Sequence, residues 1–115
     1  MPESYSIAML AAERFLRRNG FGEIDEFGFS CDEGDAQIIA KRDGVTHLVI
    51  ARAKRARGEA SKPTESEAKM RRIAMAYLID HPEVEDLEFD IVEAVIGEHA
   101  TATINANMRA YGWER

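Results

Sequence analysis

Residues 46–53 read Thr-His-Leu-Val-Ile-Ala-Arg-Ala and form the most apolar of the predicted strands. Such a continuous run of branched apolar residues is typical of a central strand with both faces covered. A helix is predicted next, ending near Asp80, and a second apolar strand covers 87–96 (Leu-Glu-Phe-Asp-Ile-Val-Glu-Ala-Val-Ile). A strand, a helix and a further strand indicate a right-handed crossover onto a mixed sheet. The stretch 46–53 therefore predicts an α/β domain.

The remaining elements extend this unit in both directions. Periodicity and turn residues predict a helix over 5–19, strands over 24–30 and 36–40, an acidic turn over 32–35, and a last strand over 100–106. The order is α-β-β-β-α-β-β. We expect a mixed five-stranded sheet flanked by helices, in one domain that spans 1–115.

Two local signals concern the ends of elements. Thr64 is predicted to cap the second helix, with Glu67 completing a capping box, and His81-Pro82 to end it. The tail from Asn107 is predicted to form a short turn or helix that packs its aromatic residues.

Composition limits the class of protein. Hydrophobic residues make up 45% of the chain and charged residues 31%, as in ordinary globular domains. The single cysteine, Cys31, cannot form an internal disulfide, which favours the reducing cytoplasm. No apolar run approaches the roughly 20 residues that span a bilayer, so no membrane partner is expected.

The charges are distributed unevenly. The net charge is −6, yet residues 41–72 hold ten Lys or Arg and four acids, which gives +6 there and −12 elsewhere. A basic segment of this kind raises the local concentration of a phosphate backbone. The alternative is a solvated basic face balanced by acidic flanks.

Four segments, in order and spacing, resemble a known family. They are Gly34-Asp35-Ala36-Gln37-Ile38-Ile39-Ala40, Leu48-Val49-Ile50-Ala51-Arg52-Ala53-Lys54, the helix with Lys69, Arg71-Arg72 and Ala74-Met75-Ala76-Tyr77-Leu78, and Glu88-Phe89-Asp90-Ile91-Val92. Together they resemble the YraN-like family of the restriction-endonuclease-like superfamily. The resemblance implies a nuclease core and hydrolysis of nucleic acid with Mg²⁺ or Mn²⁺.

The acidic residues that the resemblance implies are replaced. A strand Asp maps onto Gln37, a strand Glu onto Arg52 and a helix Glu onto Met9, while the Lys is retained as Lys54. An arginine beside a divalent cation costs several kcal/mol, even at an effective dielectric constant of about 20. Asp35 lies two residues before Gln37, so we expect the two to share one face of a strand and Asp35 to approach the same pocket.

The string Gly22-Glu23-Ile24-Asp25 copies a motif of the family one strand too early. Between Asp25 and Arg52 there are 26 residues, whereas 14 separate Gln37 from Arg52, close to the spacing in the family. Asp25 is therefore not assigned as a metal ligand.

The retained lysine and the basic segment define a candidate anion-binding set. Its members are Arg52, Lys54, Arg55, Arg57, Lys69, Arg71 and Arg72. The alternative for Arg52 and Lys54 is ion pairing with Asp35, Asp90 or an acid of the tail. Gln37 either joins this polar pocket or satisfies a hydrogen bond in the core. The three histidines show no metal-ligand spacing in the sequence.

Three functions follow. The first is a catalytically degenerate nuclease fold that binds DNA, RNA or another polyanion and needs no metal or cofactor. The second is an active Mg²⁺- or Mn²⁺-dependent nuclease whose ligands have migrated, for example to Asp35 and Glu13. The third is a protein-interaction domain, with a homodimer among the expected assemblies.

Overall fold

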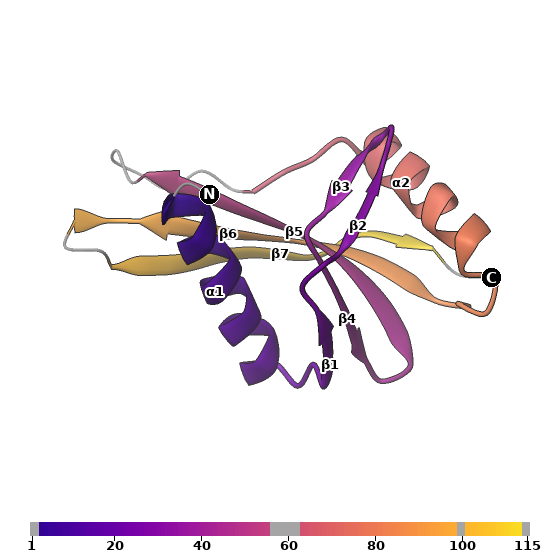
Figure 1. Ribbon diagram of the computed structural model, residues 1–115, viewed down its shortest axis with the longest axis horizontal. Coiled ribbons are helices and arrows are strands. Elements are labelled where there is room, and N and C mark those ends of the chain that lie inside the picture. The colour runs from indigo at the N-terminus through magenta and orange to yellow at the C-terminus, as the bar shows by residue number, and fades with distance from the viewer. Residues whose placement is uncertain (1–2, 56–62, 99–100, 114–115) are drawn as a thin grey trace.

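The structure is a computed structural model that describes residues 3–55, 63–98 and 101–113. Two helices and seven strands form within these ranges (Figure 1). They are α1 (Glu3–Arg18), β1 (Glu23–Asp25), β2 (Phe29–Cys31), β3 (Gly34–Ala36), β4 (Ile38–Arg42), β5 (Val45–Arg55), α2 (Glu67–Asp80), β6 (Leu87–Ile96) and β7 (Ala102–Trp113).

Five of the strands form a mixed sheet in the order β1-β4-β5-β6-β7. β5 and β6 are parallel and joined through α2, while the other neighbouring pairs are antiparallel. The predicted α/β class and mixed five-stranded sheet are confirmed. β2 and β3 form a separate hairpin that packs near α2 (Figure 1).

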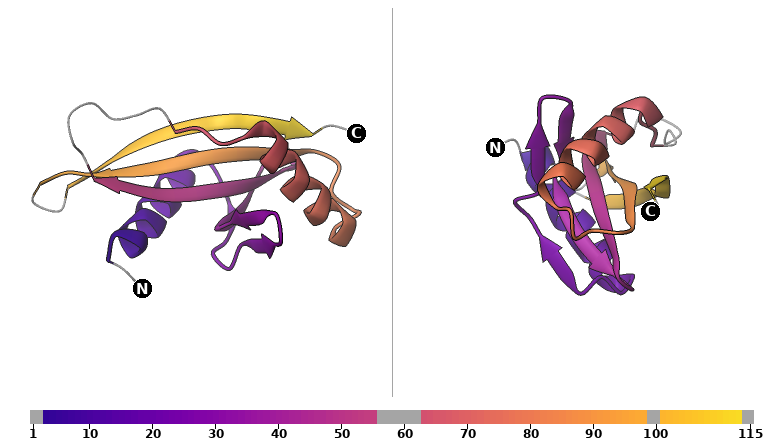
Figure 2. Two further views of the ribbon diagram at one scale, coloured as in Figure 1. Left: turned by 90° about the horizontal axis from the view of Figure 1, so that it is seen from above. Right: turned by 90° about the vertical axis from the view of Figure 1, so that its right-hand side faces the viewer.

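The two helices cover different faces of the long strands. Leu48 and Ile50 of β5 pack with Ile73 of α2, whereas Val49 of β5 packs with Leu16 of α1. Alternate residues of a strand point to opposite faces, so α1 and α2 lie on opposite faces of β5. In Figure 2 the long strands β5, β6 and β7 run side by side, with the helices toward opposite ends of them.

The predicted strand over 24–30 is wrong, because the chain breaks into β1 and β2. Between them Gly28 adopts φ +67°, and a Cβ there would lie 2.2 Å from the Ala36 carbonyl oxygen. Only glycine permits this close approach of two backbone segments. The strand predicted over 36–40 is likewise displaced, since β3 ends at Ala36 and β4 begins at Ile38.

The predicted turn or helix in the tail is also wrong. β7 continues to Trp113 as an antiparallel partner of β6, with a bulge opposite Asp90. Tyr111 and Trp113 pack against the core on the α2 side, as their aromatic character suggested. The open edge of β6 satisfies the backbone of this segment, so pairing outweighs its weak strand propensity.

Of the two predictions for the ends of α2, the one for the start of the helix is wrong and the one for its end is confirmed. Ser66 is the N-cap, and its side chain accepts a hydrogen bond from the Lys69 N–H at 3.3 Å, so the capping box predicted at Thr64 is wrong. His81 ends the helix as predicted, and β6 has its predicted bounds. No helix in the described part of the chain is long and apolar enough to cross a membrane.

Candidate anion-binding site

The cations predicted at the end of β5 lie on one face of that strand. Arg52 and Lys54 follow the alternation of Ile50, which faces α2. The Arg52 guanidinium donates to the Thr64 carbonyl and lies 3.2 Å from Glu65 Oε2, in the segment that leads into α2. The Arg52 side chain remains 30% exposed. It is therefore held in place and still reachable from solvent.

Glu65 also joins this site to α2. Lys69 Nζ lies 3.5 Å from Glu65 Oε2, so one carboxylate bridges cations from β5 and α2. Arg52, Lys54 and Lys69 are called the basic site below. The ion-pairing alternative is thus realised for Arg52, but through Glu65 rather than through Asp35 or Asp90.

The other predicted cations lie outside the basic site. Arg55 is exposed at the end of β5 and, by alternation, on the opposite face of the strand from Arg52 and Lys54. Arg71 is exposed on α2, and Arg72 is paired with Glu33 of the β2–β3 turn at 2.8 Å. Arg57 lies outside the described residues.

Glu93 of β6 is a member of this region that the sequence did not reveal. It stands opposite Arg52 in the parallel pairing of β5 with β6, and is only 6% exposed. Its Oε1 is the one buried side-chain oxygen or nitrogen of the described residues that has no hydrogen-bond partner. An acid within an apolar strand was the available signal, because acids are rarely buried without a partner.

Gln37 and Asp35 do not act together. Gln37 Oε1 accepts a hydrogen bond from the Ala51 N–H at 2.8 Å, which is the core hydrogen bond considered above. Asp35 is exposed in β3, opposite Ser30. Because β3 ends at Ala36, the expectation that Asp35 and Gln37 share one face of a strand is wrong.

The residues present do not fit the divalent cation that the resemblance implies. Gln37 is engaged by the backbone of β5, and the Arg52 guanidinium brings positive charge where a carboxylate is needed. Glu13 is paired with Arg17 on α1 at 2.9 Å. The pKa of Glu13 is lowered by hydrogen bonds with Glu26 and Arg17. Neither it nor Asp35 belongs to a group of three convergent ligand atoms within the described ranges.

The one such group found there lies elsewhere, on the α1 face. His47 Nδ1 is 2.6 Å from Asp90 Oδ2 and 3.8 Å from Glu88 Oε2. The other oxygens are engaged by Arg109: its backbone N–H donates to Asp90 Oδ1 at 2.8 Å, and its Nε lies 3.1 Å from Glu88 Oε1. His47, Glu88, Asp90 and Arg109 are called the β6 network below.

The β6 network has a structural explanation. It joins β5, β6 and β7 at the bulge, where Arg109 adopts φ +55°. Arg109 and the His47 ring lie next to all four carboxylate oxygens of Glu88 and Asp90, so the protein itself supplies their partners. His47 and Asp90 are buried, and the Phe21 ring packs perpendicular to the imidazole with 4.6 Å between the ring centroids.

No protein-family model matches this chain, and no curated protein matches it. The assignment of the site therefore depends on its geometry alone.

Proposed function

We propose that this domain binds the phosphate backbone of a nucleic acid through the basic site and does not hydrolyse it. The observation that carries the proposal is Arg52, fixed by Thr64 and Glu65 with part of its guanidinium side chain open to solvent. An arginine presents several donors in a planar fork that matches phosphate oxygens. A guanidinium already held in place loses less conformational freedom on binding.

The surrounding charges favour the same ligand. Lys54 shares the strand face of Arg52, and Lys69 contacts the same carboxylate of Glu65 as Arg52 does. Glu65 and Glu93 reduce the local charge without cancelling it. Binding to a polyanion of this kind weakens steeply with salt, because each phosphate contact releases counterions.

The domain is proposed to have a restriction-endonuclease-like core that has lost its catalytic acids. The strand order β1-β4-β5-β6 with α2 as crossover supports this core. Gln37 and Arg52, at the positions of two acids implied by the resemblance, support the loss of hydrolysis.

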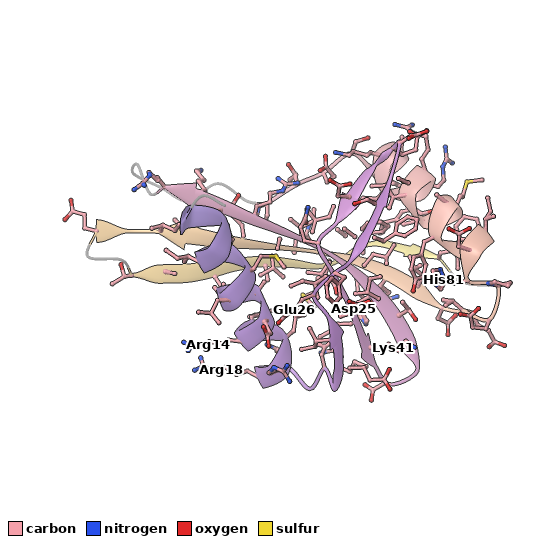
Figure 3. All side chains as sticks on the ribbon, in the orientation of Figure 1. Arg14, Arg18, Asp25, Glu26, Lys41 and His81 are labelled. Atoms are coloured by element: carbon pink, nitrogen blue, oxygen red, sulfur yellow. The ribbon has the colours of Figure 1, made fainter. Side chains whose placement is uncertain are left out.

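Fluorescence anisotropy with labelled single- and double-stranded DNA and RNA tests the proposal. We expect binding that weakens between low and moderate salt, and a salt slope reduced by about 1 for each cation removed in Arg52→Gln/Lys69→Gln. The matched control is Arg14→Gln/Arg18→Gln on α1, two exposed side chains labelled in Figure 3 on the helix that covers the other face of β5 from α2. Absence of salt-sensitive binding, or equal losses in both double variants, rejects the basic site.

A second candidate is a metal-dependent nuclease, and Glu93 is the observation that favours it. Its Oε1 is buried without a hydrogen-bond partner, so Glu93 would be one migrated acid in place of those that Gln37 and Arg52 do not supply. Incubation of labelled DNA and RNA with Mg²⁺ and with Mn²⁺ decides between the two functions. Cleavage that Glu93→Gln abolishes favours the nuclease, and inertness in both metals favours the binding domain.

A further inference from the structure

The carboxylate of Glu65 is contacted by three donors at once. Its Oε2 lies 3.2 Å from the Arg52 guanidinium and 3.5 Å from Lys69 Nζ. Its Oε1 accepts a hydrogen bond from the Ser66 backbone N–H at 3.3 Å. These donors belong to β5, to α2 and to the backbone at the N-cap of α2. The Glu65 side chain therefore occupies a small oxyanion site that the chain itself has built.

The same donors are those that bind phosphate in proteins. Arginine and lysine side chains and the backbone N–H groups at a helix N-terminus are common partners of phosphate oxygens, and the helix dipole favours negative charge there. A carboxylate and a phosphate group both present negatively charged oxygens to such donors. A phosphate that contacts Arg52 and Lys69 in this way has to displace the Glu65 carboxylate.

The contacts of Glu65 are weak enough to be displaced. All three are longer than the roughly 2.7–2.9 Å of strong charge-assisted hydrogen bonds. The side chains of Glu65, Arg52 and Lys69 are 23%, 30% and 39% exposed, and solvent screens ion pairs of this kind. Thr64 and Ser66 on either side of Glu65 are exposed, so the segment lies at the surface and the carboxylate can turn into solvent.

Arg52 does not depend on Glu65 alone for its position. Its guanidinium also donates to the Thr64 backbone carbonyl. The neighbouring Pro63 carbonyl accepts a hydrogen bond from Asn107 Nδ2 of β7 at 3.3 Å, which ties this segment to the sheet. When the carboxylate leaves, the guanidinium therefore stays in place and its charge becomes available to the ligand.

We propose that Glu65 is an intramolecular competitor in the basic site, and that a nucleic acid binds there by displacing its carboxylate with a phosphate group. Glu65 then determines specificity, because a ligand has to bind Arg52 and Lys69 more strongly than a carboxylate that is tethered beside them. Weak single anions are excluded in this way. The inference rests on the proposed nucleic-acid binding at the same site.

Fluorescence anisotropy of Glu65→Gln with the same labelled oligonucleotides tests the inference. Glutamine keeps the size of the side chain and an acceptor for the Ser66 N–H, so we expect the affinity at low salt to rise about fivefold. The matched control is Glu67→Gln, which removes the same charge from an exposed side chain in the first turn of α2. The control should raise the affinity by less than about twofold, through net charge alone. Thermal melts establish that both variants are folded.

A double-mutant cycle shows whether Glu65 acts through the cations of the basic site. In an Arg52→Gln background the competitor has lost one of its two cations, so the further change Glu65→Gln should raise the affinity by at most about twofold. A fivefold gain that is the same with and without Arg52 would overturn the competitor role.

Two other results also overturn it. Weaker binding in Glu65→Gln than in the parent chain would make Glu65 a residue that positions Arg52 for the ligand. Equal gains in Glu65→Gln and Glu67→Gln would mean that only net charge matters. Absence of salt-sensitive binding in both the parent chain and Glu65→Gln rejects the proposed nucleic-acid binding itself, and is thereby distinct from a failure of the competitor alone.

Discussion

The β6 network and the region around Arg52 are two polar clusters built on the same strand pair. His47 stands opposite Glu88, and five positions later Arg52 stands opposite Glu93, on the other face of the sheet. In the β6 network each carboxylate has a partner on two sides. Near Arg52, by contrast, Glu93 Oε1 has none and the guanidinium is directed to Glu65.

We propose that this difference separates a structural role for the β6 network from a binding role for the basic site. Burying charge is costly unless every group is paired, so a closed network contributes chiefly to the stability and register of the fold. Near Arg52 the guanidinium side chain stays 30% exposed, so a ligand can still contact it. We therefore expect substitutions in the β6 network to change the free energy of unfolding, and substitutions around Arg52 to change binding.

The largest expected effect is in the β6 network. Asp90→Ala leaves His47 and the Arg109 N–H without their shared acceptor, and should lower the free energy of unfolding by about 3–5 kcal/mol. Urea unfolding followed by circular dichroism measures it. Asp90→Asn keeps an acceptor and should lose less. A loss below about 1 kcal/mol in Asp90→Ala would show that the network is not structural.

A smaller effect, on binding rather than stability, is expected at Arg52. Arg52→Gln should weaken nucleic-acid binding about tenfold at low salt, the loss of one charge-assisted contact. Because its pair with Glu65 is partly exposed, the free energy of unfolding should change by no more than about 1 kcal/mol. Parallel anisotropy and urea experiments would separate the two quantities. A variant that is destabilised but binds normally would reverse the roles of the two clusters.

Glu93 should respond in the opposite direction from Asp90. Glu93→Gln removes a buried carboxylate that has an unpartnered oxygen, so the free energy of unfolding should stay constant or rise by up to about 1 kcal/mol. Thermal and urea unfolding of Glu93→Gln beside Asp90→Asn compares the same chemical change at both clusters. If both amides destabilise the protein equally, the distinction between an open and a closed cluster is lost.

The smallest effect concerns pH and Tyr77, a buried residue of α2. The pKa of Tyr77 is raised in the folded state, first by burial, so folding favours the protonated phenol. That stability is present below the unfolded pKa, near 10, and is lost as the pH rises through the folded value. Thermal melts above pH 10 should therefore fall less steeply for Tyr77→Phe than for the parent chain. Parallel pH profiles would contradict the raised pKa.

The sequence predicted the parts of the fold that depend on local pattern. Apolar periodicity located both helices and the strands β5 and β6, and these segments define the crossover at the centre of the sheet. The local pattern gave wrong predictions around Gly28, where one predicted strand is two, and in β7, where a turn or helix was predicted. There the outcome depends on which segments approach each other, and neighbouring residues along the chain carry little information about that.

The candidate site likewise has one part that the sequence predicted and another that it did not. The sequence by itself determined that Arg52 and Lys54 share a strand face beside an apolar core, because side chains alternate along a strand. Only the tertiary structure decided which acids meet these cations. Glu65 arrives from the segment before α2, and Glu93 through the register of two parallel strands that are far apart in the chain. Register and crossover geometry are set by packing of the whole sheet, so these contacts cannot be read from either segment alone.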